Sequence, residues 1–378
     1  MHVHMHNYFR FKEFLTRELF EIYFLLGLRN FALYMIGIFI PIFFYSELSY
    51  SIPYIAFFYL LLFLSVVISL PFSAKVISKF GTKHSMMFSV PIIVIGYLFL
   101  LFIGSNPLYF YFAAFFLGAE LAFFWPAFHI DAALHGRKKS TGKKSALIFA
   151  ISLFPSIIGP LIGALTINYL GFTTLFIIAI LLLIISSIPL FISRETFAKT
   201  DFQIKDFFVK DHLKFFFEYF AEGINSMVKG VFWPLFIFLI LGGYISLGIY
   251  ATFTGIIITA IILLFGEISD EGKKKYLLIK ISAFSKTILA TLMFFVTSVF
   301  QVYFVGTLNS IATYGISIPM LAKSYKQAKK EKTMEFILFR ELSLIAGRIF
   351  VILLVMVFAS LKISFLATGI TYIFFLFI

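Results

Sequence analysis

Gly37-Ile-Phe39-Ile-Pro41-Ile-Phe43 is the stretch that decides the fold, because it returns as Gly230-Val-Phe232-Trp-Pro234-Leu-Phe236. The two prolines are 193 residues apart. A second pair keeps the same shift, with Pro126 in Phe124-Trp-Pro-Ala and Pro319 in Ser317-Ile-Pro-Met. All four prolines lie in long hydrophobic runs. The chain is therefore predicted to consist of two homologous membrane halves in tandem, an architecture common among membrane carriers.

The composition places the chain in a membrane. Of its 378 residues, 61% are hydrophobic and 13% are charged, whereas a soluble domain carries about 25% charged residues. The chain has no cysteine, which excludes disulfides, thiolate metal sites and thiol catalysis. The formal net charge of +13 is explained by the position of the basic residues, so we expect no nucleic acid among the partners.

Twelve segments are apolar and long enough to cross a bilayer, which takes about 20 residues. They are predicted at residues 21–45, 52–74, 85–104, 107–134, 145–169, 172–193, 214–242, 245–267, 277–297, 299–322, 336–359 and 362–378. Lys and Arg gather in the loops on one side, whereas the opposite loops hold only Lys362. By the positive-inside rule, both termini of this multi-pass protein are expected in the cytoplasm, with the chain in the cell (inner) membrane.

The predicted fold class is an all-α integral membrane protein, with twelve transmembrane helices in two pseudo-symmetric six-helix bundles. The longest polar stretch lies between the repeats. We therefore expect an N-terminal bundle over residues 1–193, a cytoplasmic linker over 194–213 and a C-terminal bundle over 214–378. The sequence predicts no cofactor and no metal.

This plan resembles the major facilitator superfamily, and the loop after the second span supports the resemblance. Ala74-Lys-Val-Ile-Ser78-Lys79-Phe-Gly81-Thr82-Lys83 is similar to the Gly-x-x-x-Asp-Arg-x-Gly-Arg-Lys pattern of that family, with its first Gly and its Asp replaced. The second half carries Gly266-Glu-Ile-Ser-Asp270-Glu-Gly272-Lys273-Lys274, in which the turn is one residue shorter. The resemblance implies alternating access, with gating roles for the turn residues Lys79, Gly81, Lys83 and Asp270.

A second motif, Gly159-Pro160-Leu-Ile-Gly163-Ala164, is similar to the Gly-Pro-x-x-Gly-Gly core of the proton-coupled exporters in the superfamily. The last glycine of that core is Ala164 here. Small residues also let two helices approach closely, and proline bends a helix. Plain helix packing is thus an equal alternative to a role in proton exchange.

Ionisable residues deep in a bilayer are costly and point to function. The candidates here are Arg29, Glu120, Glu222, Lys229 and Arg348. Glu120, beside Phe124 and Trp125, is predicted to carry the coupling proton together with Glu222, because a carboxyl group away from water is more easily protonated. A structural ion pair and a direct contact with the cargo are the alternatives for Glu120.

Arg29 and Glu222 are also 193 residues apart, so the repeat places them at equivalent positions. We expect them on opposite walls of a central cavity, where they form an inner gate when the cytoplasmic side closes. A static ion pair that holds two helices together is the alternative.

Polar residues form stripes on two predicted spans. Glu222, Asn225, Ser226 and Lys229 share one helix face, and Asn309, Thr313 and Ser317 share another. We predict that the cargo binds to Lys229, Asn225, Asn309, Thr313 and Arg348. Arg348 suits an anion or a carboxylate, with a salt bridge to Glu120 as its alternative. The neutral stripes would otherwise serve as hydrogen bonds between helices.

The predicted function is secondary active transport of a small molecule by alternating access, as proton-coupled export of a small organic compound. Its partners would be that substrate, the lipid bilayer and protons. The first alternative is uptake of a polar or anionic nutrient, because three buried cations are unusual for a lipophilic cargo. A membrane-embedded enzyme acting on lipid headgroups through His129, Asp131 and His135 is the alternative from another class. The third alternative is a structural or accessory membrane protein with no catalytic activity of its own.

Overall fold

The computed structural model describes residues 17–135, 142–188, 213–269, 272–330 and 332–377. Within these ranges the regular structure is helical and contains no strand. All of the expected linker except its last residue lies outside the described residues, and so does Asp270.

The helices of the first half follow the predicted spans closely. They are α2 (Arg17–Ile36), η1 (Gly37–Phe39), α3 (Ile40–Ser46), α4 (Ile52–Phe80), α5 (Thr82–Leu101), α6 (Leu108–His135) and α7 (Gly142–Ser187). The second half contains α8 (Leu213–Met227), η5 (Val228–Phe232), α9 (Trp233–Leu241), α10 (Tyr244–Ser269), α11 (Gly272–Met293), α12 (Val299–Lys330), α13 (Thr333–Phe358), α14 (Lys362–Tyr372) and η6 (Ile373–Phe377).

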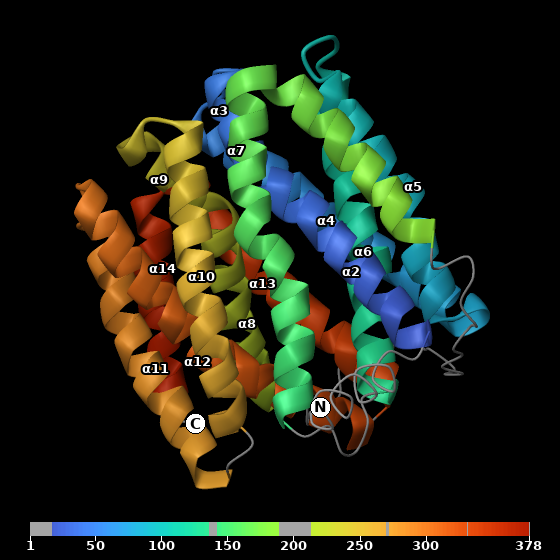
Figure 1. Cartoon of the computed structure of the whole chain (residues 1–378), viewed down its shortest axis with the longest axis vertical. Coiled ribbons are helices and arrows are strands. Elements are labelled where there is room, and N and C mark those ends of the chain that lie inside the picture. Colours follow the sequence, from blue (N-terminus) through green and yellow to red (C-terminus); the bar gives the residue numbers. More distant parts are fainter. Residues whose placement is uncertain (1–16, 136–141, 189–212, 270–271, 331, 378) are drawn as a thin grey trace, which may run out of the picture.

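The twelve predicted spans can be located in these helices. Ten helices of the described chain are long and apolar enough to cross a membrane, and a shorter apolar helix runs over Lys362–Leu376. The twelfth crossing is inside α7, because its backbone leaves helical geometry at Gly171, with φ 82° and ψ 170°. Figure 1 shows α7 rising to the upper end of the molecule and turning back there. The predicted fold class is confirmed.

The repeated proline stretches produce the same local feature in both halves. Pro41 is the second residue of α3 and follows the 3-10 turn η1, and Pro234 is the second residue of α9 and follows the π-helical turn η5. Proline has no backbone N–H, so it disrupts a helix interior but is tolerated in the first turn. Each half therefore begins with a broken span.

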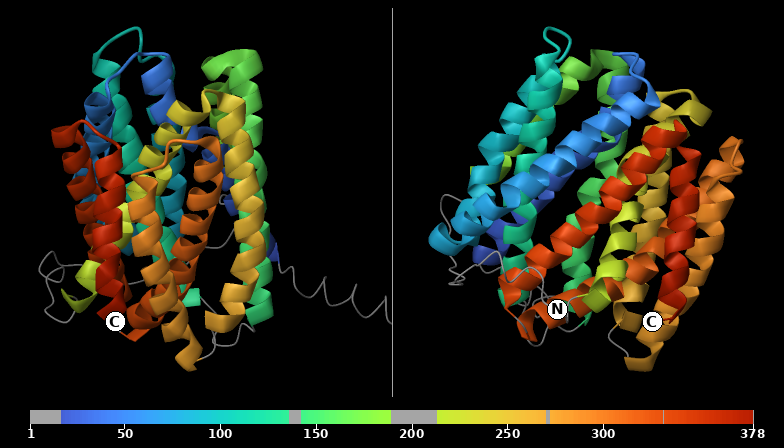
Figure 2. Two further views of the ribbon diagram at one scale, coloured as in Figure 1. Left: turned by 90° about the vertical axis from the view of Figure 1, so that its left-hand side faces the viewer. Right: turned by 180° about the vertical axis from the view of Figure 1, so that it is seen from behind.

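The two halves pack side by side along two seams (Figures 1 and 2). Helix α4 lies against α13, and α7 lies against α10. In the second seam, the Thr252 hydroxyl donates a hydrogen bond to the Ile157 carbonyl at 2.7 Å. A Cβ atom added at Gly248 would come within 2.6 Å of the Ala164 side chain. These helices therefore approach closely where both residues are small.

Hydrogen bonds join the halves near both ends. Where α3 ends and α10 begins, towards the upper end of the ribbon in Figure 1, the Tyr244 hydroxyl lies 3.1 Å from Ser46 Oγ and 3.2 Å from Glu47 Oε1. At the lower end, His129 Nδ1 of α6 lies 2.8 Å from the Tyr325 hydroxyl of α12. The space between the halves is thus bridged by polar contacts on both sides.

Candidate functional site

A cavity of about 310 Å³ lies between the two halves. It is lined by α6, α8, α12, α13 and η6, so helices from both halves form its wall. Its charged and titratable lining residues are His129, Glu218, Glu222, Arg340, Glu341 and Arg348. The rest of the wall is largely apolar, with Trp125, Ile316, Met320 and Phe375 among its members. A cavity of this kind suits a small polar ligand.

Glu222 lies on the wall formed by α8 and is held by two hydroxyl groups. Ser317 donates a hydrogen bond to Glu222 Oε1 at 3.0 Å, and Tyr372 donates one to Oε2 at 2.7 Å. Among the described residues, no cation lies within ion-pair distance of this carboxylate. Each carboxylate oxygen has a further lone pair, so Glu222 can still accept a hydrogen bond from a cation in the cavity.

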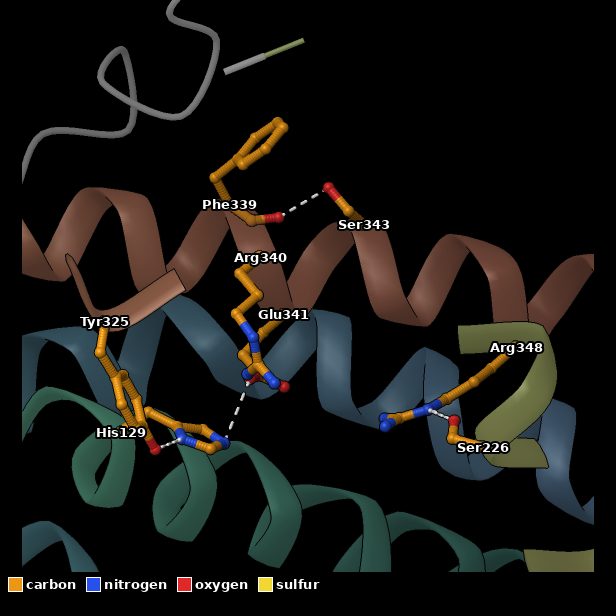
Figure 3. Close-up of polar contacts among 8 residues, drawn as sticks. All are labelled: His129, Ser226, Tyr325, Phe339, Arg340, Glu341, Ser343 and Arg348. Carbon is orange, nitrogen blue, oxygen red and sulfur yellow. Dashed lines mark hydrogen bonds and ion pairs between the residues drawn. The ribbon is translucent and has the colours of Figure 1, made fainter. Parts of the chain in front are cut away.

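Arg348 presents the opposite charge from α13. Its Nε donates a hydrogen bond to Ser226 Oγ at 2.9 Å (Figure 3). Its guanidinium lies 5.1 Å from the centre of the Phe63 ring. Its two Nη atoms have no hydrogen-bond partner in the described chain. Two parallel N–H groups of this kind match the two oxygens of a carboxylate.

The remaining charged residues of the cavity are paired with one another or with neighbours. Arg340 Nη1 lies 2.5 Å from Glu341 Oε1, and His129 Nε2 lies 4.0 Å from that same oxygen (Figure 3). Lys323 Nζ donates to Glu218 Oε1 at 2.8 Å, while the buried Glu218 Oε2 has no hydrogen-bond partner. The second oxygen of Glu218 therefore adds a free acceptor to the cavity wall.

The ion pair of the first half lies away from this cavity. Arg29 donates to Glu120 Oε1, and its guanidinium lies 3.7 Å from the centre of the Phe124 ring. Both charged residues are almost fully buried. The predicted Arg29–Glu222 pair is therefore not formed, because each residue is bonded within its own half. The contact between Arg29 and Glu120 supports the alternative in which Glu120 belongs to a structural ion pair. The salt bridge from Arg348 to Glu120, which was the alternative for Arg348, is not formed either.

The stripes of α8, η5 and α12 have different partners from those we predicted. Lys229 donates to the Tyr314 hydroxyl at 2.8 Å. Asn309 and Thr313 accept hydrogen bonds from Lys286 of α11, at 3.4 Å and 2.6 Å respectively. Together with Asn225 and Lys229, they line a separate space of about 10 Å³ inside the second half. Asn309 and Thr313 thus form contacts between helices, which is the alternative that we gave for the stripes. A role of these residues in binding cargo stays a prediction.

Lys286 is the residue that the sequence analysis missed. It is fully buried, in the middle of a helix that also carries Lys280 and Lys275. The signal was available, because Lys286 lies inside the predicted span 277–297, where an intramembrane charge points to function by default.

The turn residues of the first family motif adopt the expected local structure. Gly81 joins α4 to α5 as a single residue with φ 96°, a conformation that favours glycine. Lys79 lies over the Phe80 ring, at 5.2 Å from its centre, and Lys83 is buried. Their gating role remains a prediction.

The residues of the enzyme alternative point to different partners. His129 contacts Tyr325, whereas Asp131 Oδ1 accepts a hydrogen bond from Thr82 at 3.3 Å. No group of three or more metal-binding side chains gathers anywhere in the described ranges. His135 ends α6, and its side chain is outside the described part. The described geometry does not bring His129 and Asp131 together as a site.

The small residues of the second motif pack two helices of the same half together. An added Cβ at Gly163 would collide with the Met35 carbonyl of α2, and one at Gly159 would come within 3.1 Å of the Tyr34 side chain. Helix packing thus accounts for both glycines.

The comparisons with known proteins agree with this architecture. The family model of the Major Facilitator Superfamily matches residues 22–215, which is more than half of the chain. The chain therefore belongs to the Major Facilitator Superfamily. It is a multi-pass membrane protein with the fold of a secondary transporter. No curated protein matches the chain.

Solved structures of transporters share the fold at low identity. A POT family transporter in complex with a thioalcohol-conjugated peptide has a TM-score of 0.71 at 12% identity, covering 96% of this chain and 95% of that one. The nucleoside transporter NupG has a TM-score of 0.66 at 13% identity, covering 95% and 98%. The E. coli fucose:proton symporter FucP has a TM-score of 0.62 at 14% identity, covering 95% and 96%. Likeness at this identity shows the fold alone.

Proposed function

We propose that this protein is a secondary active transporter that carries a small zwitterionic organic compound through the central cavity by alternating access. One observation carries the proposal. Glu222 and Arg348 are opposite charges on the cavity wall, and neither has a countercharge within ion-pair distance in the described chain. A cargo with an ammonium and a carboxylate group supplies both.

The spacing of the two charges supports a small cargo. Arg348 is anchored on Ser226, which follows Glu222 by one turn of α8, a step of about 6 Å along the helix axis. The ammonium group would lie on Glu222 and the carboxylate on the Nη atoms of Arg348. The volume of about 310 Å³ is at the lower end of the roughly 300–1,000 Å³ typical of small-molecule sites.

One of the similar structures agrees with this charge pattern. A POT family transporter with a TM-score of 0.69 was solved in complex with 5-aminolevulinic acid, a compound with one amino and one carboxyl group. The charged cavity also favours a polar cargo over a lipophilic one, as the uptake alternative assumed.

We further propose that protons drive the transport and that its direction is export. The protein would lie in the inner membrane of the cell, with both termini in the cytoplasm. Buried carboxylates, the basic loops and the likeness to a fucose:proton symporter support this proposal. Uptake and export differ in the direction of the proton relative to the cargo. In uptake the proton moves with the cargo, and in export it moves against the cargo.

A ligand series with matched charges tests the proposal. Purified protein would be melted with glycine, β-alanine, γ-aminobutyric acid and dialanine, each beside its N-acetylated and its amidated form. A ligand that binds the folded state raises the melting temperature by mass action. We expect at least one zwitterion to stabilise the protein more than both of its singly charged forms. Equal shifts for all three forms would contradict the proposal.

Two variants then assign each charge. With Arg348→Gln, the amidated form should bind as well as the zwitterion, because the carboxylate has lost its partner. With Glu222→Gln, the N-acetylated form should bind as well as the zwitterion, because the ammonium group has lost its partner. Lys280→Gln, which removes an exposed lysine of α11, is the matched control and should retain the preference of the wild type.

A further inference from the structure

Lys286 is a buried ammonium group without a contacting carboxylate in the described chain. Its Nζ donates hydrogen bonds to Thr313 Oγ1 at 2.6 Å and to Asn309 Oδ1 at 3.4 Å, both from α12. From α14, the Tyr372 ring covers it, with its centre 4.9 Å from Nζ. Two neighbouring helices, α12 and α14, thus enclose this charge of α11 in a membrane-spanning bundle.

Tyr372 links Lys286 to the cavity. The same side chain that covers Lys286 donates its hydroxyl hydrogen to Glu222 Oε2. The charged groups that act on Lys286 through space are Glu222 of α8 and Lys229 of η5. Glu222 is therefore the carboxylate that Tyr372 links to Lys286 in the described part of the chain.

An ammonium group in a nonpolar interior is costly unless a countercharge compensates it. Its charge therefore depends on whether Glu222 is ionised and free. A cargo ammonium bound to Glu222 would take up that compensation and add a second positive charge nearby. The cargo carboxylate would lie on Arg348 of α13, which is bonded to Ser226 and shares no partner with Lys286, so we expect it to act on Lys286 more weakly.

We infer that Lys286 is the proton-exchanging group of the carrier: cargo binding at Glu222 expels one proton from Lys286, and cargo release allows it to return. This inference rests on the proposed function and adds that the binding of cargo and the binding of a proton oppose each other. Cargo on Glu222 and the proton on Lys286 then oppose each other, and linkage requires that each weakens the binding of the other. A carrier with this competition exchanges cargo for a proton, which is the requirement for export driven by proton entry.

The structure offers a route for the proton. Asn309 and Thr313, the two acceptors of Lys286, also line the space of about 10 Å³ that reaches Lys229. This is about the size of one water molecule, so a water molecule there could lie between the acceptors of Lys286 and Lys229. The N–H bond of the ammonium breaks, the electron pair stays on Nζ, and a water molecule in this polar space accepts the proton; return reverses the same step.

Calorimetry in two buffers of different ionisation enthalpy counts the protons released per bound ligand. The ligand would be the strongest binder of the four named zwitterions, titrated into purified full-length protein between pH 6 and pH 8. We expect the wild type to release up to one proton per ligand, so that its affinity rises with pH by up to about tenfold per unit. Proton uptake on binding would overturn the inference.

Two substitutions separate proton exchange from a structural role. Lys286→Met removes the charge, and a buried charge replaced by an apolar residue of similar volume is often tolerated. Lys286→Arg keeps the charge but cannot lose its proton. Both should bind with no proton released from this site, and the arginine variant should bind more weakly than the methionine variant because its charge stays.

Controls make each outcome decisive. Lys280→Gln should release as many protons as the wild type, and His129→Phe excludes the titratable imidazole in the cavity as the source. Proton release that persists in either folded Lys286 variant would refute the inference while leaving the proposed cargo site intact. Failure of the wild type to bind any of the four zwitterions would instead refute the proposed function.

Discussion

Arg29 and Glu222 stand at equivalent positions of the two repeats, yet each is bonded to the fourth span of its own half. Arg29 of α2 pairs with Glu120 of α6, and Glu222 of α8 accepts a hydrogen bond from Ser317 of α12. Both halves thus have a polar link between equivalent helices, an ion pair in the first half and a hydrogen bond to a neutral hydroxyl in the second. The charged pair of the first half is self-contained, and the carboxylate of the second half is free for a ligand.

Glu120→Gln should destabilise the protein by about 3–5 kcal/mol, because it leaves Arg29 buried without a countercharge. Melting of the purified variant measures the effect. The double variant Arg29→Met, Glu120→Leu should recover most of the loss, since neither charge remains. If Glu120→Gln melts like the wild type but no longer couples transport to protons, Glu120 is a proton carrier and not a structural partner.

Tyr325→Phe should shift the carrier toward the state open at the lower end of Figure 1. The variant loses the hydrogen bond to His129, which is worth about 0.5–1.5 kcal/mol, so the population should change about two- to tenfold. Because the chain has no cysteine, a single Ser324→Cys in the cavity wall reports opening through its rate of thiol labelling. Tyr303→Phe on the same helix, whose hydroxyl has no hydrogen bond in the described structure, should label at the unchanged rate.

Tyr244→Phe should have the opposite effect. Its hydroxyl contacts Ser46 and Glu47 at the upper end, so its loss favours opening there and slows labelling of the same cysteine from the lower end. Faster labelling in both tyrosine variants would mean that these substitutions loosen the protein in general.

Gly163→Ala should destabilise the protein, by about 1–3 kcal/mol as is usual for overpacking, because the new methyl group meets the Met35 backbone. Gly37→Ala provides the control, since nothing lies within 4 Å of a Cβ there. Melting curves of the two variants make the comparison. A Gly163→Ala variant as stable as wild type but unable to exchange protons would favour the exporter meaning of the motif over helix packing.

The sequence predicted several residues of the site, but it did not predict which side chains they contact. Glu222 and Arg348 were recognisable because a charge within an apolar span is rare and costly, and both line the cavity. Their partners were not recognisable. Asn309 and Thr313, predicted to bind cargo, are turned toward Lys286, and the contact depends on how α11 packs on α12.

The sequence by itself determined the number of membrane crossings and the division into two repeats. Both follow from local properties, namely the length of apolar runs and the recurrence of proline at a fixed shift. Only the tertiary structure decided which buried charges neutralise each other. A helix fixes the face on which a side chain lies, but rotation and approach of neighbouring helices decide which partner it meets, and so Arg29 is compensated by Glu120 while Glu222 and Arg348 remain open to a ligand.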